Sequence, residues 1–131
     1  MAKIAVIGGG AAGMLAAGRA AQRGHEVHLF EKNNRLGKKI LITGKGRCNV
    51  TNDGDLDAFL DNIPGNPYFM YSAFYRFDNQ ALRQLLLDMG LETKVERGNR
   101  VFPVTDRSLD VVQALETVSY THLTLPTKLE V

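Results

Sequence analysis

The sequence predicts an α/β fold, the opening part of a doubly wound sheet, from three features near its N-terminus. An apolar run at residues 3–7 leads into the pattern G-x-G-x-x-G at residues 8–13. A segment with alanines from Ala11 to Ala21 has strong helix propensity, and Gly24 after Arg23 is typical of a helix end. A second apolar run at residues 27–30 then ends in Glu31. Strand, glycine turn, helix, strand and acid, in this order, are the dinucleotide-binding fingerprint in its required context.

Each glycine of the fingerprint has a mechanical role. Gly8 allows the tight turn out of the strand, Gly10 lets the backbone approach a pyrophosphate, and Gly13 lets the helix lie close to the sheet. The N–H groups and positive dipole end of the helix would then face the phosphates. The alternative is a glycine-rich turn that binds nothing, which leaves the acid at the end of the second run unexplained.

Glu31 narrows the choice of nucleotide. A carboxylate at this place accepts hydrogen bonds from a ribose diol and repels a 2′-phosphate, which disfavours NADP. FAD and NAD both remain open on this feature. The alternative is an ordinary solvated glutamate at the end of a strand.

A basic stretch punctuated by glycines follows at residues 32–52. Residues 38–43 fit either a short helix or a strand, and Gly44 and Gly46 permit an irregular loop that presents backbone N–H groups. Such a loop could complete a phosphate cradle, with cationic contacts from Lys38, Lys39, Lys45 and Arg47. The alternatives are a solvated basic loop and a nucleic-acid patch, and the stretch lacks the interleaved aromatic residues that favour the latter.

The rest of the chain predicts further helices and one hairpin. Asp78 is a natural N-cap for an amphipathic helix that extends to Met89. The other expected elements are a helix packed in the core at residues 66–77, two strands at 91–96 and 100–104 around Gly98-Asn99, and a last helix capped by Asp106 or Ser108 with Leu109, Val112 and Leu115 facing inward.

Composition excludes several classes of protein. The chain has 131 residues, 44% of them apolar, which suits one domain with a core. A net charge of +2 gives no general attraction to nucleic acid or membrane, and no apolar run approaches the length of a membrane span. The single cysteine, Cys48, cannot form an internal disulfide, and neither His25 nor His28 has a second ligand at metal spacing. We therefore expect a cytoplasmic protein that has no metal and does not bind nucleic acid or membranes.

Three motifs beyond the fingerprint indicate a family. They are LGKK at residues 36–39, TGKGRCNVTN at residues 43–52 and RVFP at residues 100–103. With the N-terminal turn, they resemble the BaiN/YhiN-like flavoproteins, which are NAD(P)/FAD-dependent oxidoreductases with a glutathione-reductase-type FAD domain. The similarity extends from residue 1 to about residue 116.

The resemblance implies FAD as the bound nucleotide and assigns roles by analogy. Gly8, Gly10 and the amides of Ala11 and Ala12 would hold the pyrophosphate. Glu31 would hold the adenosine ribose, with Lys32 near the adenine. The path toward the flavin would be lined by Lys38 and by the loop residues Thr43, Gly44, Gly46, Arg47, Cys48 and Asn49. Lys45 departs from the pattern, because many relatives carry glycine there.

The resemblance also divides the chain. Residues 1–116 would be a partial, Rossmann-like FAD-binding domain, with a βαβ unit at 1–32, a cofactor loop at 33–54 and a helical and hairpin segment at 55–116. Family members are several times longer, so we expect a fragment. Residues 118–127 resemble a translated sequencing-library adapter and do not continue the helix that begins near residue 110. Residues 117–131 are therefore expected to be a non-native tail, the alternative being a genuine β-prone tail.

The expected function is that of the FAD-binding part of a flavin-dependent oxidoreductase. The flavin would carry the redox chemistry, NAD(P)H could serve as electron donor, and a small molecule would be the substrate. No residue can be assigned as catalytic acid or base. The alternatives are a nucleotide-binding module without a redox role and a truncated chain without activity of its own.

Overall fold

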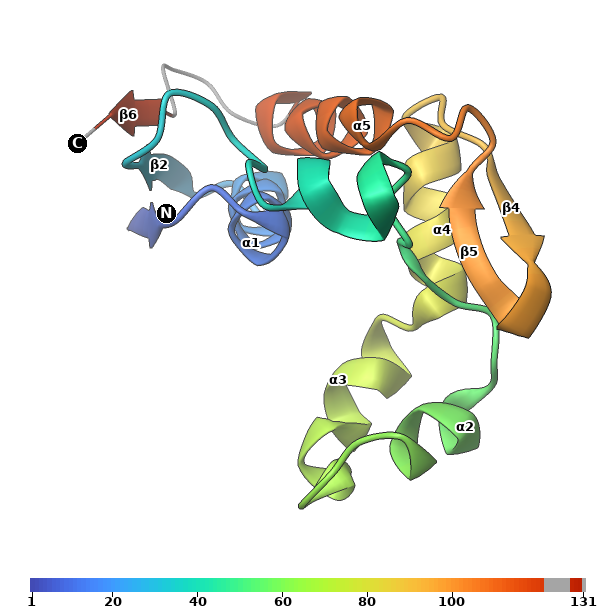
Figure 1. Ribbon diagram of the computed structural model, residues 1–131. Helices are drawn as coiled ribbons and strands as arrows, with labels where there is room; N and C mark the ends of the chain where they lie inside the picture. The colour runs from blue at the N-terminus through green and yellow to red at the C-terminus, as the bar shows by residue number, and fades with distance from the viewer. Residues whose placement is uncertain (122–127, 131) are drawn as a thin grey trace.

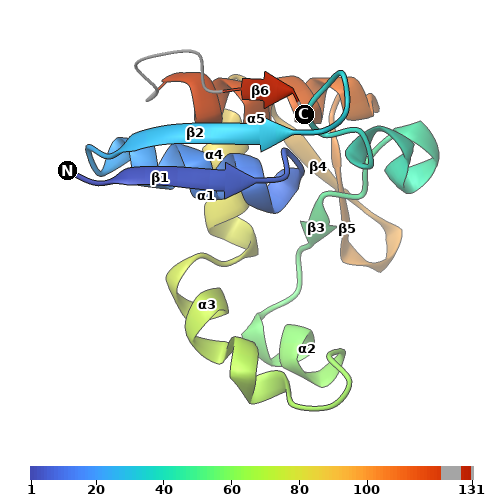
Figure 2. The same ribbon diagram turned by 90° about the vertical axis from the view of Figure 1, so that its left-hand side faces the viewer.

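The computed structural model describes residues 1–121 and 128–130. Its first sheet is parallel, with the strand order β1-β2-β6 (Figure 2). These strands are β1 (Lys3–Ile7), β2 (Glu26–Glu31) and β6 (Lys128–Glu130). β1 lies beside β2 in the register Val6–Leu29, as a βαβ unit requires. The predicted α/β class is confirmed.

Helix α1 (Ala11–Gln22) connects β1 to β2, and its small side chains let it pack closely. Met14 and Ala17 are fully buried in the core. A Cβ added at Gly18 would lie 3.0 Å from the Val118 carbonyl oxygen, so helix α5 (Ser108–Thr121) approaches α1 at backbone distance. Both helices lie on one side of the parallel sheet, behind it in Figure 2.

Burial in β1 alternates along the strand, although its run is largely apolar. Parallel strands with such runs are usually buried on both faces. Here Ile4 and Val6 face α1, whereas Lys3, Ala5 and Ile7 are exposed, Ile7 to 80%. Within the described residues, the helices therefore cover only one face of β1.

A second, antiparallel sheet has the strand order β3-β5-β4. Its strands are β3 (Thr51–Asn52), β4 (Thr93–Glu96) and β5 (Arg100–Pro103). The β4–β5 turn, 3-10 helix η3 (Arg97–Asn99), places Gly98 and Asn99 at positive φ, which the Gly-Asn pair predicted. The expected hairpin is confirmed.

Helix α4 (Asn79–Asp88) is also confirmed. The side chain of Asp78 accepts a hydrogen bond from the Ala81 N–H (2.8 Å), as expected of an N-cap. Leu86 is completely buried and joins α4 to the core formed by Met14, Leu29 and Leu115.

The segment at residues 55–77 forms an arm outside the core, contrary to the prediction of a core helix. It contains α2 (Leu56–Asp61), 3-10 helix η2 (Pro67–Met70) and α3 (Tyr71–Arg76), which extend away from the parallel sheet (Figures 1 and 2). Tyr68, Phe69 and Tyr75 are 75–82% exposed. Aromatic content alone suggested burial, but the arm packs mainly on itself, with the Phe59 and Phe74 rings 5.2 Å apart.

Helix α5 continues past residue 116, contrary to the expectation that it stops there. It reaches Thr121, because Val118 and Ser119 are buried and extend the inward face of Val111 and Leu115 by another turn. β6 then pairs with β2 through Leu129 and Phe30. Residues 122–127, which carry most of the adapter-like sequence, lie outside the described residues, and the origin of the tail stays a prediction.

Candidate nucleotide-binding site

The glycine turn has the geometry that its three glycines predicted. Gly8 adopts a φ of +100°, and its N–H donates to the Phe30 carbonyl (2.8 Å), which joins the turn to β2. A Cβ added at Gly13 would lie 1.8 Å from the Gly8 carbonyl oxygen, so only glycine permits this approach of α1. A Cβ added at Gly10 would meet nothing within 4 Å, so the space in front of the turn is open.

The beginning of α1 carries no side-chain cap. Gly10 is the N-cap residue, and the first turn contains no acidic residue. Ala11 and Ala12 are exposed and have no polar side-chain atoms. The N–H groups at a helix start need an acceptor and favour an anion. Open space and an uncapped helix start therefore coincide at one place.

Glu31 is buried at 8% exposure and is held by backbone amides. Its Oε1 accepts from the Gly9 N–H (2.8 Å) and its Oε2 from the Asn33 N–H (2.7 Å). The carboxylate is thereby fixed at the glycine turn, and the alternative of a solvated strand end is wrong. Lys32, next in sequence, is exposed.

Gly9 and the segment after β2 are parts of this site that the sequence assignments missed. A Cβ at Gly9 would lie 2.2 Å from Leu36 Cδ2, and the Gly9 carbonyl accepts from the Gly37 N–H (2.8 Å). The segment after β2 thus folds back over the turn and buries Leu36. The LGKK motif was the available signal, but only its lysines were assigned to the site, and Leu36 and Gly37 were used only for family resemblance.

The loop Thr43–Asn49 has an irregular backbone, as its glycines predicted. The 3-10 helix η1 (Ile40–Gly46) begins inside residues 38–43, so the short helix is the alternative that the structure supports, and the backbone leaves helical geometry at Thr43, Gly44 and Lys45. Four residues adopt positive φ: Gly44, Lys45, Gly46 and Cys48. The Cys48 N–H donates to the Thr43 carbonyl (3.0 Å) and closes the loop. Lys45 takes the left-handed conformation that glycine would favour.

Several side chains of this loop point toward the second sheet. Arg47 binds Asp106 and Glu96. The Asn49 side-chain amide, oriented as its neighbours require, donates to the Thr51 carbonyl (2.9 Å). Cys48 is 6% exposed, and burial raises the pKa of its thiol. Lys38, Lys39 and Lys45, in contrast, are exposed.

Arg47 belongs to a cluster of charged side chains that shift one another's pKa values. The hydrogen bond from Lys94, followed by that from Arg47, lowers the pKa of Asp106. The hydrogen bond from Arg47 lowers the pKa of Glu96. Both carboxylates are therefore charged at neutral pH. No hydrogen bond or ion pair joins residues 43–49 directly to the glycine turn at residues 8–13, both of which the structure describes.

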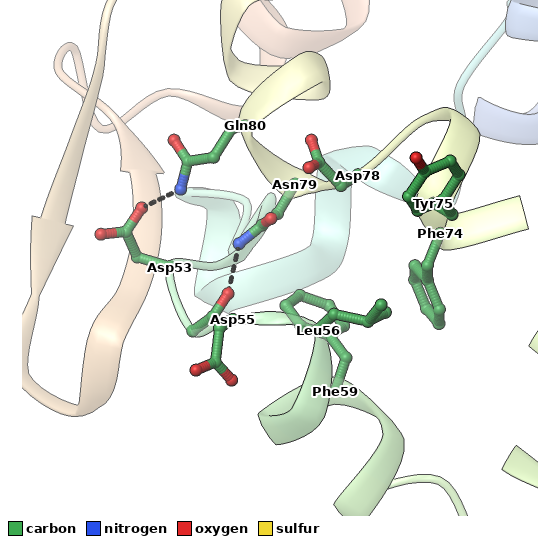
Figure 3. A pocket seen from close by; sticks show the side chains of 10 residues that line it. Asp53, Asp55, Leu56, Phe59, Phe74, Tyr75, Asp78, Asn79 and Gln80 are labelled. Atoms are coloured by element: carbon green, nitrogen blue, oxygen red, sulfur yellow. Dashed lines mark hydrogen bonds between the residues drawn. The ribbon is translucent and has the colours of Figure 1, made fainter. Parts of the chain in front are cut away.

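A separate pocket of about 450 Å³ lies between the arm and the start of α4 (Figure 3). Three aspartates line it, and each already has a structural partner. Asp55 caps α2, Asp78 caps α4, and Asp53 binds Gln80 and Arg83. The carboxylates of this pocket therefore cap helices or join the loop before α2 to α4. Among the described residues, no group of three or more His, Cys, Asp or Glu residues has a metal-binding arrangement.

Comparison with known proteins assigns the domain. The HI0933-like protein Rossmann domain matches residues 2–130. The chain belongs to this family. The cofactor of the HI0933-like domain is FAD, which confirms the nucleotide that the resemblance implied. The match also passes residue 116, where the resemblance was expected to end.

The relatives that this chain matches are much longer than the chain itself. The chain is 36% identical over 118 residues to a 3-dehydro-bile acid delta(4,6)-reductase of Clostridium scindens, an alignment that covers 88% of this chain and 28% of that protein. It is 44% identical over 73 residues to a ribosomal RNA dihydrouridine synthase of Escherichia coli, covering 55% of this chain and 18% of that protein. The chain thus spans less than a third of each relative.

The fold has a counterpart among solved structures. The crystal structure of Thermovibrio ammonificans THI4 superposes with a TM-score of 0.63 at 13% identity, covering 98% of this chain and 37% of that one. This supports the Rossmann-like fold. No helix in the described part of the chain is long and apolar enough to cross a membrane.

Proposed function

We propose that the glycine turn and Glu31 hold the adenosine diphosphate half of FAD, in a protein that acts as a flavin-dependent oxidoreductase. The observation that carries this proposal is the buried Glu31 carboxylate, fixed 2.8 Å from the Gly9 N–H at the turn itself. Ribose and pyrophosphate are adjacent groups in FAD, and their proposed partners are adjacent here.

The pyrophosphate end is supported by space and by polarity. The open volume beside Gly10 would admit phosphate oxygens, and the N–H groups at Ala11 and Ala12 would donate to them. A phosphate would then provide the acceptor that no side chain provides at this helix start. The residues present therefore fit the group.

The ribose end is supported by the fixed carboxylate. Two backbone N–H groups orient Glu31, so little side-chain entropy remains to be lost when a ribose diol binds. Its charge would repel a 2′-phosphate. Exposed Lys32 would lie toward the adenine.

Toward the flavin, we propose that Lys38 and the Thr43–Asn49 loop line the path. FAD would supply the hydride and electron transfer, while this chain binds and orients it. NAD(P)H is the proposed electron donor. The proposed substrate is a small molecule. This is in line with the name of the bile acid reductase, which is 36% identical to this chain over 88% of its length.

The proposal is tested by adding bulk at Gly10. Gly10→Val should abolish FAD binding in a flavin fluorescence titration, because the side chain would fill the pyrophosphate position. Ala16→Val is the matched control, since Ala16 is exposed on the same helix away from the turn. Full flavin affinity in Gly10→Val would overturn the site. Reduction of the bound flavin by NADH or NADPH would distinguish a redox enzyme from a nucleotide-binding module.

A further inference from the structure

Four charged side chains connect the cofactor loop to the hairpin, and we call them the Arg47 cluster: Arg47, Lys94, Glu96 and Asp106. Arg47 donates to Asp106 Oδ1 through Nε (2.9 Å) and Nη2 (2.7 Å), and to Glu96 through Nη2. Lys94 Nζ lies 2.8 Å from Asp106 Oδ2 and 3.2 Å from Glu96 Oε2. The cluster joins the loop to β4 and to the segment between β5 and α5, which lie 49 and 59 residues away from Arg47 in sequence.

The guanidinium of Arg47 is held on its face as well as its edge. Its Cζ lies 4.0 Å from the centroid of the Phe102 ring, and Phe102 is 3% exposed on β5. The planar guanidinium combines this cation–π contact with two N–H donors to one carboxylate oxygen, a combination that lysine does not reproduce. Arg47 thus has a specific seat on the second sheet.

The loop that Arg47 belongs to needs such support. Lys45 and Cys48 are non-glycine residues at φ of +56° and +61°. This conformation is unfavourable for residues that carry a Cβ, and it persists where the surroundings impose it. Arg47 lies between these two residues, so its contacts act where the backbone is least favourable.

We propose that the Arg47 cluster holds the Thr43–Asn49 loop in its cofactor-facing conformation, and that Arg47 is a positioning residue and not a ligand of the FAD phosphates. The FAD part of this inference rests on the proposed function, whereas the loop part does not. Two cations and two carboxylates give the cluster a net charge of zero, so it offers little attraction to a phosphate. The lowered pKa values of Asp106 and Glu96 support this balance.

The chain contains its own reporter of the loop. Cys48 is its single cysteine, follows Arg47 directly and is 6% exposed. Its thiol can react with a disulfide reagent such as DTNB only when the loop opens or the protein unfolds. The labelling rate therefore measures loop opening without any cofactor.

The experiment compares labelling of the full chain and its variants. Arg47→Ala should raise the Cys48 labelling rate about tenfold or more, with little dependence on added urea, because the opening is local. Arg47→Lys should recover only part of the protection. Asp106→Asn should raise the rate, and asparagine tolerates the φ of +58° that Asp106 adopts. Arg100→Ala is the matched control, since Arg100 also lies over Phe102 (5.7 Å) but forms no ion pair within the described residues. It should label like wild type.

Leu86→Ala serves as the reference for global destabilisation, because Leu86 is fully buried in the core away from the loop. Its labelling should rise only through global unfolding and should depend steeply on urea. If Arg47→Ala behaves in the same way, or if wild-type Cys48 labels as fast as a free thiol, the cluster does not hold the loop and the inference is wrong.

A parallel FAD titration separates the two proposals. Arg47→Ala should weaken FAD binding only as far as the closed fraction of the loop falls, because the apparent Kd is the intrinsic Kd divided by that fraction. Weaker FAD binding with unchanged labelling would mean that Arg47 contacts the cofactor directly, which overturns the positioning role. If wild type bound no FAD at all, the proposed function would fail, and the labelling experiment would still decide whether the cluster holds the loop.

Discussion

Replacing Glu31 tests the proposed site most directly, because its carboxylate serves the fold and the proposed ligand in different ways. In the fold it accepts from the N–H groups of Gly9 and Asn33. Glu31→Gln keeps the size but exchanges one acceptor oxygen for an NH₂ group, which would then face a backbone donor. A buried donor without an acceptor costs about 1–3 kcal/mol, so we expect the free energy of unfolding to fall by about that amount.

The effect on FAD should be separate from this loss of stability. A hydrogen bond to a charged acceptor is worth about 1.5–3 kcal/mol, so losing one ribose contact would raise the Kd about 10- to 150-fold. Glu31→Ala should weaken binding further, because both oxygens are lost. Flavin fluorescence titration measures the Kd, and urea unfolding measures the stability of the same samples.

Glu26→Gln is the control, since Glu26 begins the same strand and its carboxylate binds His28 instead of the glycine turn. The FAD affinity of Glu26→Gln should stay within about twofold of the wild-type affinity, because the Glu26–His28 contact is a surface pair of small energetic effect. If Glu31→Gln lowered stability but left the Kd unchanged, Glu31 would be a purely structural tie and the ribose assignment would be refuted.

Two further predictions concern packing and pH. Gly13→Ala should both destabilise the domain by about 1–3 kcal/mol and impair FAD binding, because its Cβ would lie 1.8 Å from the Gly8 carbonyl; an unchanged urea midpoint would contradict the required close approach. The Arg47 cluster should stabilise the protein fully above the ordinary carboxyl pKa values of 3.8 and 4.5, and this contribution should fall as pH drops through the lowered folded-state values. Acid unfolding of Arg47→Ala against wild type measures this, and added salt should shrink the difference; equal pH profiles would contradict it.

Features that depend on residues close in sequence were predicted, whereas contacts between residues far apart in sequence were not. β1, α1, β2 and the β4–β5 hairpin were predictable, because local apolar runs, glycine placement and turn residues encode them. The partners of Arg47 were not, since Glu96 and Asp106 lie 49 and 59 residues away in sequence. A basic residue in a glycine-rich loop looked like a phosphate contact, and only the tertiary structure supplied its carboxylates.

Two predictions were wrong because local sequence does not show which tertiary neighbours are available: burial of the arm, and the end of α5. Aromatic residues at 66–77 suggested burial, yet Phe69 is 82% exposed, because aromatic content does not say which neighbour is available to cover it. At the end of α5, the adapter-like sequence from residue 118 suggested that the helix stops, yet Val118 continues it. There, burial against Gly18 outweighs a weak intrinsic preference.

Truncating the chain at two points separates two questions: whether the end of α5 stabilises the core, and whether the residues after it are a native part of the fold. Ending the chain at Glu116 removes Val118, which is 8% exposed and packs against Gly18 of α1, together with the fully buried Ser119. Burial of a valine side chain is worth about 1.5–3 kcal/mol, so this variant should be less stable by about that amount.

Ending the chain at Thr121 keeps that interface and removes only residues 122–131. β6 contributes three residues to the parallel sheet, and among the described strands it pairs with β2. If the tail is foreign to the fold, the melting temperature and urea midpoint should stay at their wild-type values. Marked destabilisation of this variant would mean that residues 122–131 are a native part of the sheet and that the adapter interpretation is mistaken. Loss in the first truncation alone would show that a foreign sequence can still extend a helix wherever its apolar residues fall on the buried face.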